Sequence, residues 1–246
     1  MTMRFAIVIP HYNHAGTLRR VAEGCLKKNP DVAVFDDGSN ISPAPQLAGL
    51  PVQFFRFKKH RGKGAVLLEA ARWAEQNGFT HIVTLDADAQ HRHQDYPSMV
   101  RLSRSCPHAI VVGKRKADRE HLSPGTRLVW GIWRLWVLLE TGKKVEDLQS
   151  GYRIYPVDLL NALSLHSEGY EFETEVIVKA LRAGAGVRSR EITAAYPKSC
   201  VSHFRPWHDH LRLLGLHLRL LFSGLLPSSH RRYEPKRKKT RNKPRA

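Results

Sequence analysis

Cysteine is scarce in this chain of 246 residues, which contains only Cys25, Cys106 and Cys200. The three are scattered and odd in number, without a Cys-x-x-Cys pair. This argues against a disulfide framework or a cysteine-based zinc cage and favours a reducing compartment. The chain also lacks an apolar run of the ~18 residues that a spanning helix needs, and no signal peptide precedes the first predicted strand. We therefore expect a cytoplasmic protein, soluble or peripheral to a membrane.

Several glycine-based signatures are absent as well. Neither a Gly-x-Ser-x-Gly elbow nor the glycine fingerprint of dinucleotide-binding folds occurs, which disfavours a hydrolase or a dehydrogenase. Residues 58–64 are basic but do not form a Walker A loop, because Gly64 stands where that loop has Ser or Thr. They precede a predicted helix, whose free N–H groups can attract a phosphate. His91 and His93 have no third ligand at a suitable spacing, so the indication of zinc is weak.

Acidic residues are few compared with basic ones: 22 Asp and Glu face 40 Lys and Arg, a net charge of +18. Residues 228–246 hold nine Lys or Arg against Glu234 alone. Prolines and the lack of apolar residues predict a disordered basic tail. Nucleic acid is one candidate partner, but no companion nucleic-acid motif occurs, so no specific nucleic acid is expected. Anionic lipid is the other, worth about 1 kcal/mol per basic residue near a membrane.

Two leucine-rich segments have the composition of interfacial helices. Residues 208–226 mix leucines with Arg212, His217 and Arg219 and stop at Pro227, and residues 127–140 contain three tryptophans. Both are too short to span a bilayer. Packing on the sheet or a homodimer interface would give the same pattern, and for residues 127–140 this alternative stays open. For residues 208–226 we favour attachment to the inner face of the cell membrane.

The remaining pattern alternates strands and helices. Strands are predicted near residues 4–10, 32–36, 52–57, 81–86 and 109–113, and helices near 16–28, 63–77 and 95–104. This alternation predicts an α/β fold with a Rossmann-like, mostly parallel sheet flanked by helices and joined by right-handed crossovers. We expect one catalytic domain over residues 1–207, an amphipathic helix over 208–227 and the basic tail over 228–246.

Polar residues follow the strand near residues 81–86. The apolar run ends in Asp86 and Asp88, with Gln90 two residues later. These three positions alternate along an extended backbone, so their side chains can face one way. Two carboxylates and an amide oxygen suit Mg²⁺ or Mn²⁺ that keeps positions open for substrate phosphates. A solvated loop in which Asp88 caps the next helix is the alternative.

Two further strands end in similar loops. The strand near 4–10 runs into residues 11–14 (His-Tyr-Asn-His), and the strand near 32–36 runs into residues 36–39 (Asp-Asp-Gly-Ser). Ligands of open α/β sheets bind beyond the carboxyl ends of the strands. Acidic residues there can hold a base or a ribose, while a metal ion binds the phosphates. The combination predicts a nucleotide site.

The segment from residue 145 to residue 153 also carries polar groups around a glycine. Gly151 permits a tight turn or a close approach of substrate, and Arg153 suits a bidentate grip of phosphate or carboxylate. A structural arginine paired with Asp147 is the alternative. Acids at residues 171–175 begin a predicted helix, where the helix dipole is enough to explain them.

Five segments, taken in order, carry a resemblance: Pro10-His-Tyr-Asn13, Asp36-Asp-Gly-Ser39, Gly62-Lys-Gly64, Asp86-Ala-Asp-Ala-Gln90 and Gln149-Ser-Gly-Tyr-Arg153. Over about residues 4–205 the chain resembles family 2 glycosyltransferases, above all the dolichyl- and polyprenyl-phosphate mannosyl- and glucosyltransferases. The resemblance implies a GT-A fold and an inverting, metal-dependent transferase. The donor would be a UDP- or GDP-linked sugar, and the acceptor a polyprenyl phosphate or glycolipid. His14 departs from the Glu that the family often has there.

The expected site residues fall into three sets. Asp86, Asp88 and Gln90 would hold Mg²⁺ or Mn²⁺. Nucleotide contacts are expected from Pro10, Tyr12, Asp36, Asp37, Lys63, Asp86, Arg115, Lys198, His203 and Arg205. Catalytic roles are expected for Asp88, Asp147 and Arg153. The metal would neutralise the departing nucleotide, and a hydroxyl acceptor would need a base such as Asp147, whereas a phosphate acceptor would not.

Two other function classes remain open at this point. A nucleotidyltransferase of similar fold would also use carboxylates, Mg²⁺ and a basic loop, but it should have a glycine-rich N-terminal loop where this chain has residues 10–14. A basic nucleic-acid-binding module would depend on residues 228–246.

Overall fold

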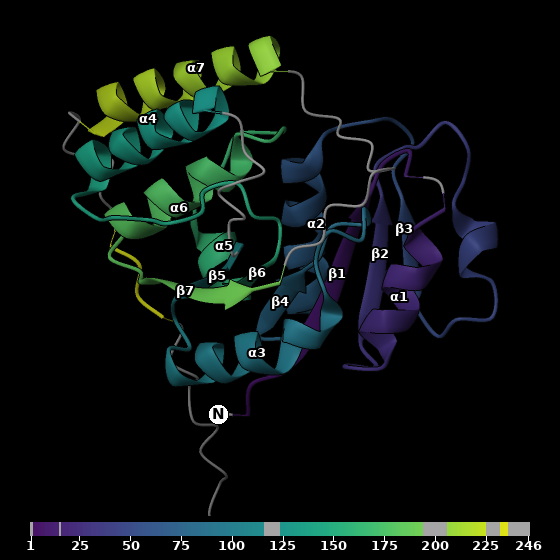
Figure 1. The fold of residues 1–246 in the computed structure, drawn as a ribbon. Coiled ribbons are helices and arrows are strands. Elements are labelled where there is room, and N and C mark those ends of the chain that lie inside the picture. The colour runs from purple at the N-terminus through teal and green to yellow at the C-terminus, as the bar shows by residue number, and fades with distance from the viewer. Residues whose placement is uncertain (1, 15, 116–123, 194–205, 225–231, 236–246) are drawn as a thin grey trace, which may run out of the picture.

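The computed structural model describes residues 2–14, 16–115, 124–193, 206–224 and 232–235. Within them, seven strands form one sheet in the order β3-β2-β1-β4-β6-β5-β7 (Figure 1). The strands are β1 (Phe5–His11), β2 (Val32–Asp36), β3 (Gln53–Arg56), β4 (His81–Thr84), β5 (Ile110–Arg115), β6 (Arg153–Pro156) and β7 (Val187–Ile192). Every pairing is parallel except those of β6, which runs antiparallel to both β4 and β5.

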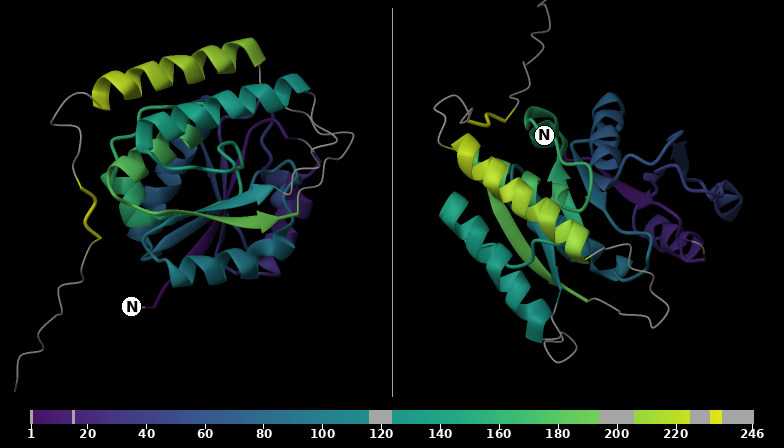
Figure 2. Two further views of the ribbon diagram at one scale, coloured as in Figure 1. Left: turned by 60° about the vertical axis from the view of Figure 1, so that its left-hand side comes forward. Right: turned by 90° about the horizontal axis from the view of Figure 1, so that it is seen from above.

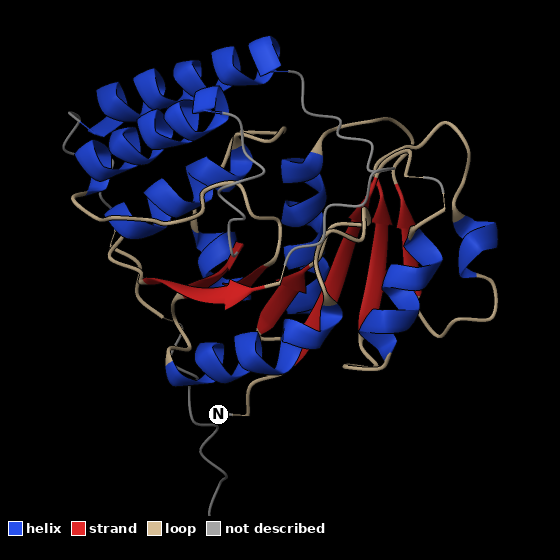
Figure 3. Ribbon diagram, viewed as in Figure 1, coloured by secondary structure: helices blue, strands red, loops and turns tan. Residues whose placement is uncertain are grey.

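Helices cover both faces of this sheet (Figure 3). They are α1 (Leu18–Leu26), α2 (Lys63–Gln76), α3 (Tyr96–Ser105), α4 (Pro124–Thr141), α5 (Val157–Ala162), α6 (Phe172–Arg182) and α7 (Pro206–Gly224), with the 3₁₀ turns η1 (Ala44–Leu47) and η2 (His93–Asp95). The predicted α/β class and mostly parallel sheet are confirmed, and the five predicted strands and three predicted helices are present. The helix predicted to begin at residues 171–175 is α6, whereas strands β6 and β7 and helix α5 were not predicted.

The central strands are buried on both faces, which explains their continuous apolar runs. In β1, Ile7 and Ile9 point to the layer of α1 and α3, where they pack with Leu18 and Met99. The alternate residues of β1 point to the layer of α2, α5 and α6. Because β1 pairs in parallel with both β2 and β4, the carboxyl ends of these three strands lie at the same edge of the sheet, between two packed helical layers.

Helices α4 and α7 form an outer layer over α6 (Figure 2). Leu213, Leu216 and Leu220 of α7 are 1–2% exposed and belong to the main core. The expectation that the leucine face of residues 208–226 is free for a membrane is therefore wrong for these three leucines. Leucines occur on more than one side of α7, and a second stripe remains exposed.

Residues 232–235, the described part of the predicted basic tail, contact the rest of the fold. Tyr233 packs against the main core, its hydroxyl donates to Asp158 Oδ2 at 2.8 Å, and its backbone N–H donates to Ala183 O at 2.8 Å. The expectation of disorder over residues 228–246 is thus wrong at residues 232–235, where an aromatic side chain finds an apolar site. None of the described helices is both long enough and apolar enough to cross a membrane.

Candidate active site

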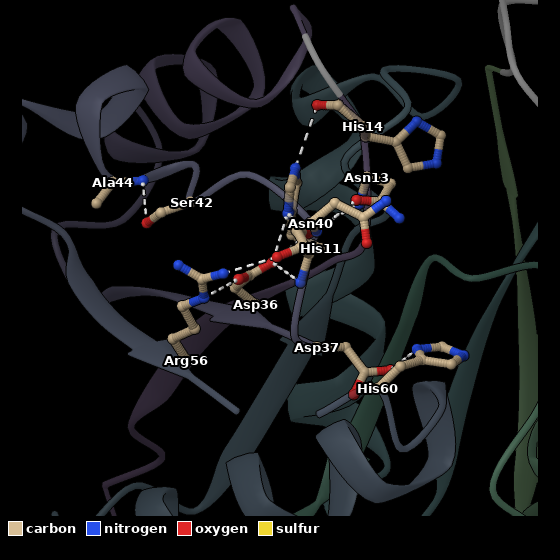
Figure 4. A network of polar contacts seen from close by, with 11 residues as sticks. His11, Asn13, His14, Asp36, Asp37, Asn40, Ser42, Ala44, Arg56 and His60 are labelled. Carbon is tan, nitrogen blue, oxygen red and sulfur yellow. Dashed lines mark hydrogen bonds and ion pairs between the residues drawn. The ribbon is translucent and has the colours of Figure 1, made fainter. Parts of the chain in front are cut away.

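Asp36 joins the ends of three strands. The register places His11 of β1 and Arg56 of β3 on either side of it. His11 Nδ1 lies 3.0 Å from Asp36 Oδ1, and Arg56 Nε lies 3.1 Å from Asp36 Oδ2 (Figure 4). The Asp36 side chain is fully buried. Its carboxylate therefore holds together the loops that follow β1 and β2. His11 belongs to the site although it is not among the residues predicted from the sequence.

Asp37 organises the loop between β3 and α2. Its carboxylate accepts backbone hydrogen bonds from Arg61 at 2.8 Å and Gly62 at 2.7 Å, and His60 Nδ1 lies 2.8 Å away. The His60 ring stacks on Tyr12 with centroids 4.0 Å apart. Like Asp36, Asp37 has protein partners and is buried. The two carboxylates thus hold the loops that carry Tyr12 and His60 rather than presenting oxygens to solvent.

The glycines beside Lys63 serve backbone packing. A Cβ on Gly62 would lie 2.2 Å from Glu168 O, and one on Gly64 would lie 2.2 Å from Ser167 O. The Gly64 N–H donates to Glu168 O at 2.8 Å. The N–H groups of Gly62 and Gly64 therefore already have protein acceptors and are not among the free N–H groups predicted to attract a phosphate at the start of α2.

The acidic loop after β4 is a tight turn. Asp88 Oδ1 accepts the Gln90 backbone N–H at 2.9 Å, Ala89 has a φ of 61°, and Thr17 donates to Ala87 O at 2.6 Å. Burial, and then the charge of Asp86, raise the pKa of Asp88 to about 6. The loop thus concentrates negative charge in a partly buried position, which favours a cation.

Lys63 lies between two carboxylates. Its Nζ is 2.6 Å from Asp86 Oδ1 and 2.8 Å from Glu173 Oε1. Burial opposes the charged form of Lys63, but the two carboxylates outweigh it and raise the Lys63 pKa. Burial likewise opposes ionised Asp86, and Lys63 outweighs it to lower the Asp86 pKa. Glu173 lies in the first turn of α6, where the helix dipole favours an acid, and its carboxylate in addition pairs with Lys63.

The backbone of Gly151 lies directly against the Asp86 carboxylate. A Cβ on Gly151 would lie 1.9 Å from Asp86 Oδ2, and the Thr84 hydroxyl donates to Gly151 O at 2.8 Å. Only glycine allows this approach, and the group that comes close to Gly151 is the Asp86 carboxylate; the predicted close approach of substrate stays a prediction.

Arg153 has a different role from the one expected. It is fully buried, and it donates to the backbone oxygens of Ser150 at 2.7 Å, Glu173 at 2.7 Å and Leu148 at 2.6 Å. The predicted grip of a substrate phosphate is wrong, because these donors are already used. Arg153 instead ties the 148–151 loop to the start of α6.

Arg115, not Arg153, is the partner of Asp147. Arg115 Nε and Nη2 donate to the two Asp147 oxygens at 2.8 and 2.9 Å, and the guanidinium lies 5.0 Å from the Trp130 ring centroid. Burial alone would raise the Asp147 pKa, but hydrogen bonds from Arg115 hold it below its ordinary value. Asp147 is therefore a weak base in this arrangement.

The donor set suits a hard divalent ion that is shared with a substrate. No group of three His, Cys, Asp or Glu side chains in the described ranges could hold an ion alone. Asp86 and Asp88 are two carboxylates in one loop, and Mg²⁺ or Mn²⁺ typically takes one or two carboxylates plus substrate phosphates. The residues fit that chemistry. Pro10 lies in β1 beside Phe35, whereas Lys198, His203 and Arg205 lie outside the described residues.

The family model described as Glycosyl transferase family 2 matches residues 6–163. A similar relative is an undecaprenyl-phosphate mannosyltransferase of Micrococcus luteus, 26% identical over 212 residues that cover 78% of this chain and 83% of the relative. Another is a polyprenol monophosphomannose synthase of Mycolicibacterium smegmatis, 28% identical over 214 residues, covering 78% and 77%.

A solved structure of glucosyl-3-phosphoglycerate synthase of Mycobacterium tuberculosis, in complex with Mn²⁺, UDP and glucosyl-3-phosphoglycerate, has a TM-score of 0.66 and 16% identity. The match covers 90% of this chain and 80% of that one, and it shows the shared fold. The fold expected from the resemblance is confirmed, and the family model matches more than half of the sequence. The chain is a member of glycosyl transferase family 2.

Proposed function

We propose that the protein is a metal-dependent, inverting glycosyltransferase that moves a sugar from a nucleotide sugar to polyprenyl phosphate at a membrane surface. The observation that carries this proposal is the acidic loop Asp86–Gln90, which lies at the same sheet edge as the buried His11–Asp36 pair. The names of the relatives support the acceptor class, because two of them are polyprenyl-phosphate mannosyl enzymes.

The donor would lie across the ends of β1, β2 and β4. The nucleobase of a UDP- or GDP-sugar would pack near Pro10 and the Tyr12 ring, which aromatic stacking favours. Asp36 and Asp37 would hold the walls of this pocket. We assign the phosphate contacts to Lys63, Arg115 and the loop residues Lys198, His203 and Arg205.

Asp86 and Asp88, with Gln90, would hold Mg²⁺ or Mn²⁺ together with the donor diphosphate. When bound, the ion supplies Lewis-acid stabilisation of the negative charge that develops on the leaving nucleotide. Asp88 is the catalytic residue of this set. Lys63 keeps Asp86 oriented through its 2.6 Å contact, and the raised pKa of Asp88 means that this carboxylate gains most from a cation.

The state of Asp147 favours a phosphate acceptor over a hydroxyl. A hydroxyl needs a base to accept its proton, whereas a phosphate oxygen is already anionic. Asp147 is the carboxylate on the acceptor side, and its two oxygens are both occupied by Arg115. Without a free base there, an acceptor that needs none fits the site better.

The outer layer supports attachment to the inner face of the cell membrane. Large apolar side chains are exposed along one stripe of α4 (Leu128, Ile132, Leu135 and Leu139) and one of α7 (Leu211, Leu214, Leu218, Leu221 and Phe222). The two helices pack side by side, and Arg127, Arg134 and Arg212 are exposed on them. Adjacent leucine and arginine side chains are typical of surfaces that bind anionic lipid. The basic tail would add charge attraction.

Isothermal calorimetry with UDP- and GDP-linked sugars, with and without Mn²⁺, tests the donor half of this proposal. We expect binding of at least one nucleotide sugar that depends on Mn²⁺ and is abolished in Asp88→Ala. Unchanged affinity in the variant with the metal present would refute the assignment of the ion to this loop.

A further inference from the structure

The ion-pair chain Asp86–Lys63–Glu173 connects the acidic loop to the helix on the opposite side of the site. Lys63 begins α2, Asp86 follows β4, and Glu173 lies in the first turn of α6. The Lys63 side chain is 15% exposed, that of Asp86 26%, and that of Glu173 only 4%. One positive charge thus pairs with two carboxylates, and Glu173 is the more deeply buried of the two.

Neighbouring groups restrict both carboxylates. Gly151 closes the side of Asp86 that carries Oδ2. The backbone oxygen of Glu173 accepts from Arg153 at 2.7 Å, which fixes the first turn of α6. Lys63 is therefore held between a carboxylate on the anchored first turn of α6 and the Asp86 carboxylate that Gly151 contacts.

A divalent ion at Asp86 would compete with the ammonium of Lys63. The ion and Lys63 would share the Asp86 carboxylate. Without a second partner the Lys63 ammonium would then be a poorly solvated, unpaired charge, which costs free energy. Glu173 supplies that second partner at 2.8 Å. We propose that Glu173 is a positioning residue that holds the Lys63 ammonium when Asp86 binds the metal-bound donor. This inference rests on the proposed function of the acidic loop.

The test measures the affinity of the full chain for the Mn²⁺ complexes of UDP and GDP by calorimetry. Glu173→Gln leaves Lys63 with Asp86 alone, so we expect about tenfold weaker binding of the metal complex, because hydrogen bonds to charged groups are of that strength. Metal-free nucleotide should bind with unchanged affinity. Glu171→Gln removes the same charge two residues away without touching Lys63 and is the matched control.

Two additional variants separate positioning from simple charge attraction. In a Lys63→Met background the effect of Glu173→Gln should shrink to less than about twofold, because Glu173 acts through Lys63. Glu173→Asp keeps the charge but shortens the reach, so it should also weaken binding if Glu173 positions Lys63. It also covers the case in which Glu173→Gln fails to fold.

The outcomes distinguish this inference from the proposed function. Equal losses from Glu173→Gln in both backgrounds, or full affinity in Glu173→Asp, would show that Glu173 acts only as a distant charge and would overturn the inference. A wild-type protein that binds neither metal complex would overturn the proposed function, and the inference with it.

Discussion

A Cβ atom on Gly151 would lie 1.9 Å from Oδ2 of Asp86. The glycine therefore sets how the first carboxylate of the acidic loop points, although 64 residues of chain lie between Asp86 and Gly151. Thr84 reinforces the contact, since its hydroxyl donates to Gly151 O.

Gly151→Ala should displace Asp86 while leaving the fold in place. Groups that orient a metal ligand typically contribute about 10–100-fold to metal affinity, so we expect metal-dependent nucleotide binding to fall at least tenfold. Calorimetry measures the affinity, and circular dichroism reports the fold. Gly131→Ala is the control, because nothing lies within 4 Å of its added Cβ and alanine favours the helix by about 1 kcal/mol. Full affinity in Gly151→Ala would contradict the account.

Tyr12→Leu should weaken nucleotide binding without changing its dependence on Mn²⁺. The Tyr12 ring already stacks on His60, and aromatic stacking is worth about 0.5–1.5 kcal/mol, so the expected loss is about two- to tenfold. Tyr170→Leu, on a residue that is 38% exposed and lies just before α6, is the control. If both variants bind alike, the base does not lie at Tyr12.

Arg115→Met should destabilise the protein in a pH-dependent way. The Asp147 pKa is lowered in the folded state, so the pair stabilises the protein at neutral pH and this contribution is lost as pH falls below about 4. Removing one partner of a buried pair costs about 3 kcal/mol or more. Urea unfolding at pH 7.5 and pH 3.5 should show a large difference from wild type at the first pH and a smaller one at the second, because the loss begins near pH 4 and is complete only below the lowered pKa of Asp147.

Lys114→Met is the comparison for that experiment. Lys114 pairs with Glu146 at 3.0 Å, but the two side chains are 33% and 47% exposed, so the cost should be below about 1 kcal/mol. An equal effect of the two substitutions at pH 7.5, or an Arg115→Met effect that does not decline in acid, would contradict the assigned pair.

The exposed stripes of α4 and α7 should bind anionic vesicles. Leu135→Gln combined with Leu218→Gln removes one exposed leucine from each stripe, and the loss of apolar burial at about 1.5–3 kcal/mol per leucine predicts at least tenfold weaker binding. Ile41→Gln, at a residue that is 85% exposed elsewhere, should have no effect. Sedimentation with vesicles in low and high salt measures the binding.

Salt separates the two contributions to that binding. The tail attraction should weaken as the Debye length shortens to ~3 Å at 1 M, whereas helix insertion should persist. Equal binding to neutral and anionic vesicles would remove the electrostatic part. If the double variant instead splits a dimer seen by size exclusion, the face joins two copies of the chain.

The sequence predicts well the part of the site that lies within single segments. The runs before Asp86 and Asp36 are buried strands, and parallel strands with helical crossovers place their polar ends at one edge. Local pattern and topology are sufficient there. At Gly151 the sequence indicates a crowded position but not its protein partner, which is the Asp86 carboxylate.

The sequence predicts less well what depends on distant partners. Arg153 looks like a phosphate ligand, yet three backbone oxygens of the 148–151 loop and α6 enclose it. Glu173 looks like a dipole residue because its partner Lys63 lies 110 positions earlier. The leucines of α7 do not show by themselves which stripe packs on α4 and which stays exposed. These features are decided by packing between segments, which periodicity does not encode.

The most direct test of the central claim is a transfer assay with a polyprenyl monophosphate acceptor, the nucleotide sugar identified by calorimetry and Mn²⁺. We predict release of the nucleoside diphosphate and a polyprenyl-phosphate sugar whose anomeric configuration, read by NMR, is inverted relative to the donor. Asp88→Ala should make neither. Release of pyrophosphate with formation of a nucleotidyl product, or sugar transfer only to a hydroxyl acceptor, would contradict the account.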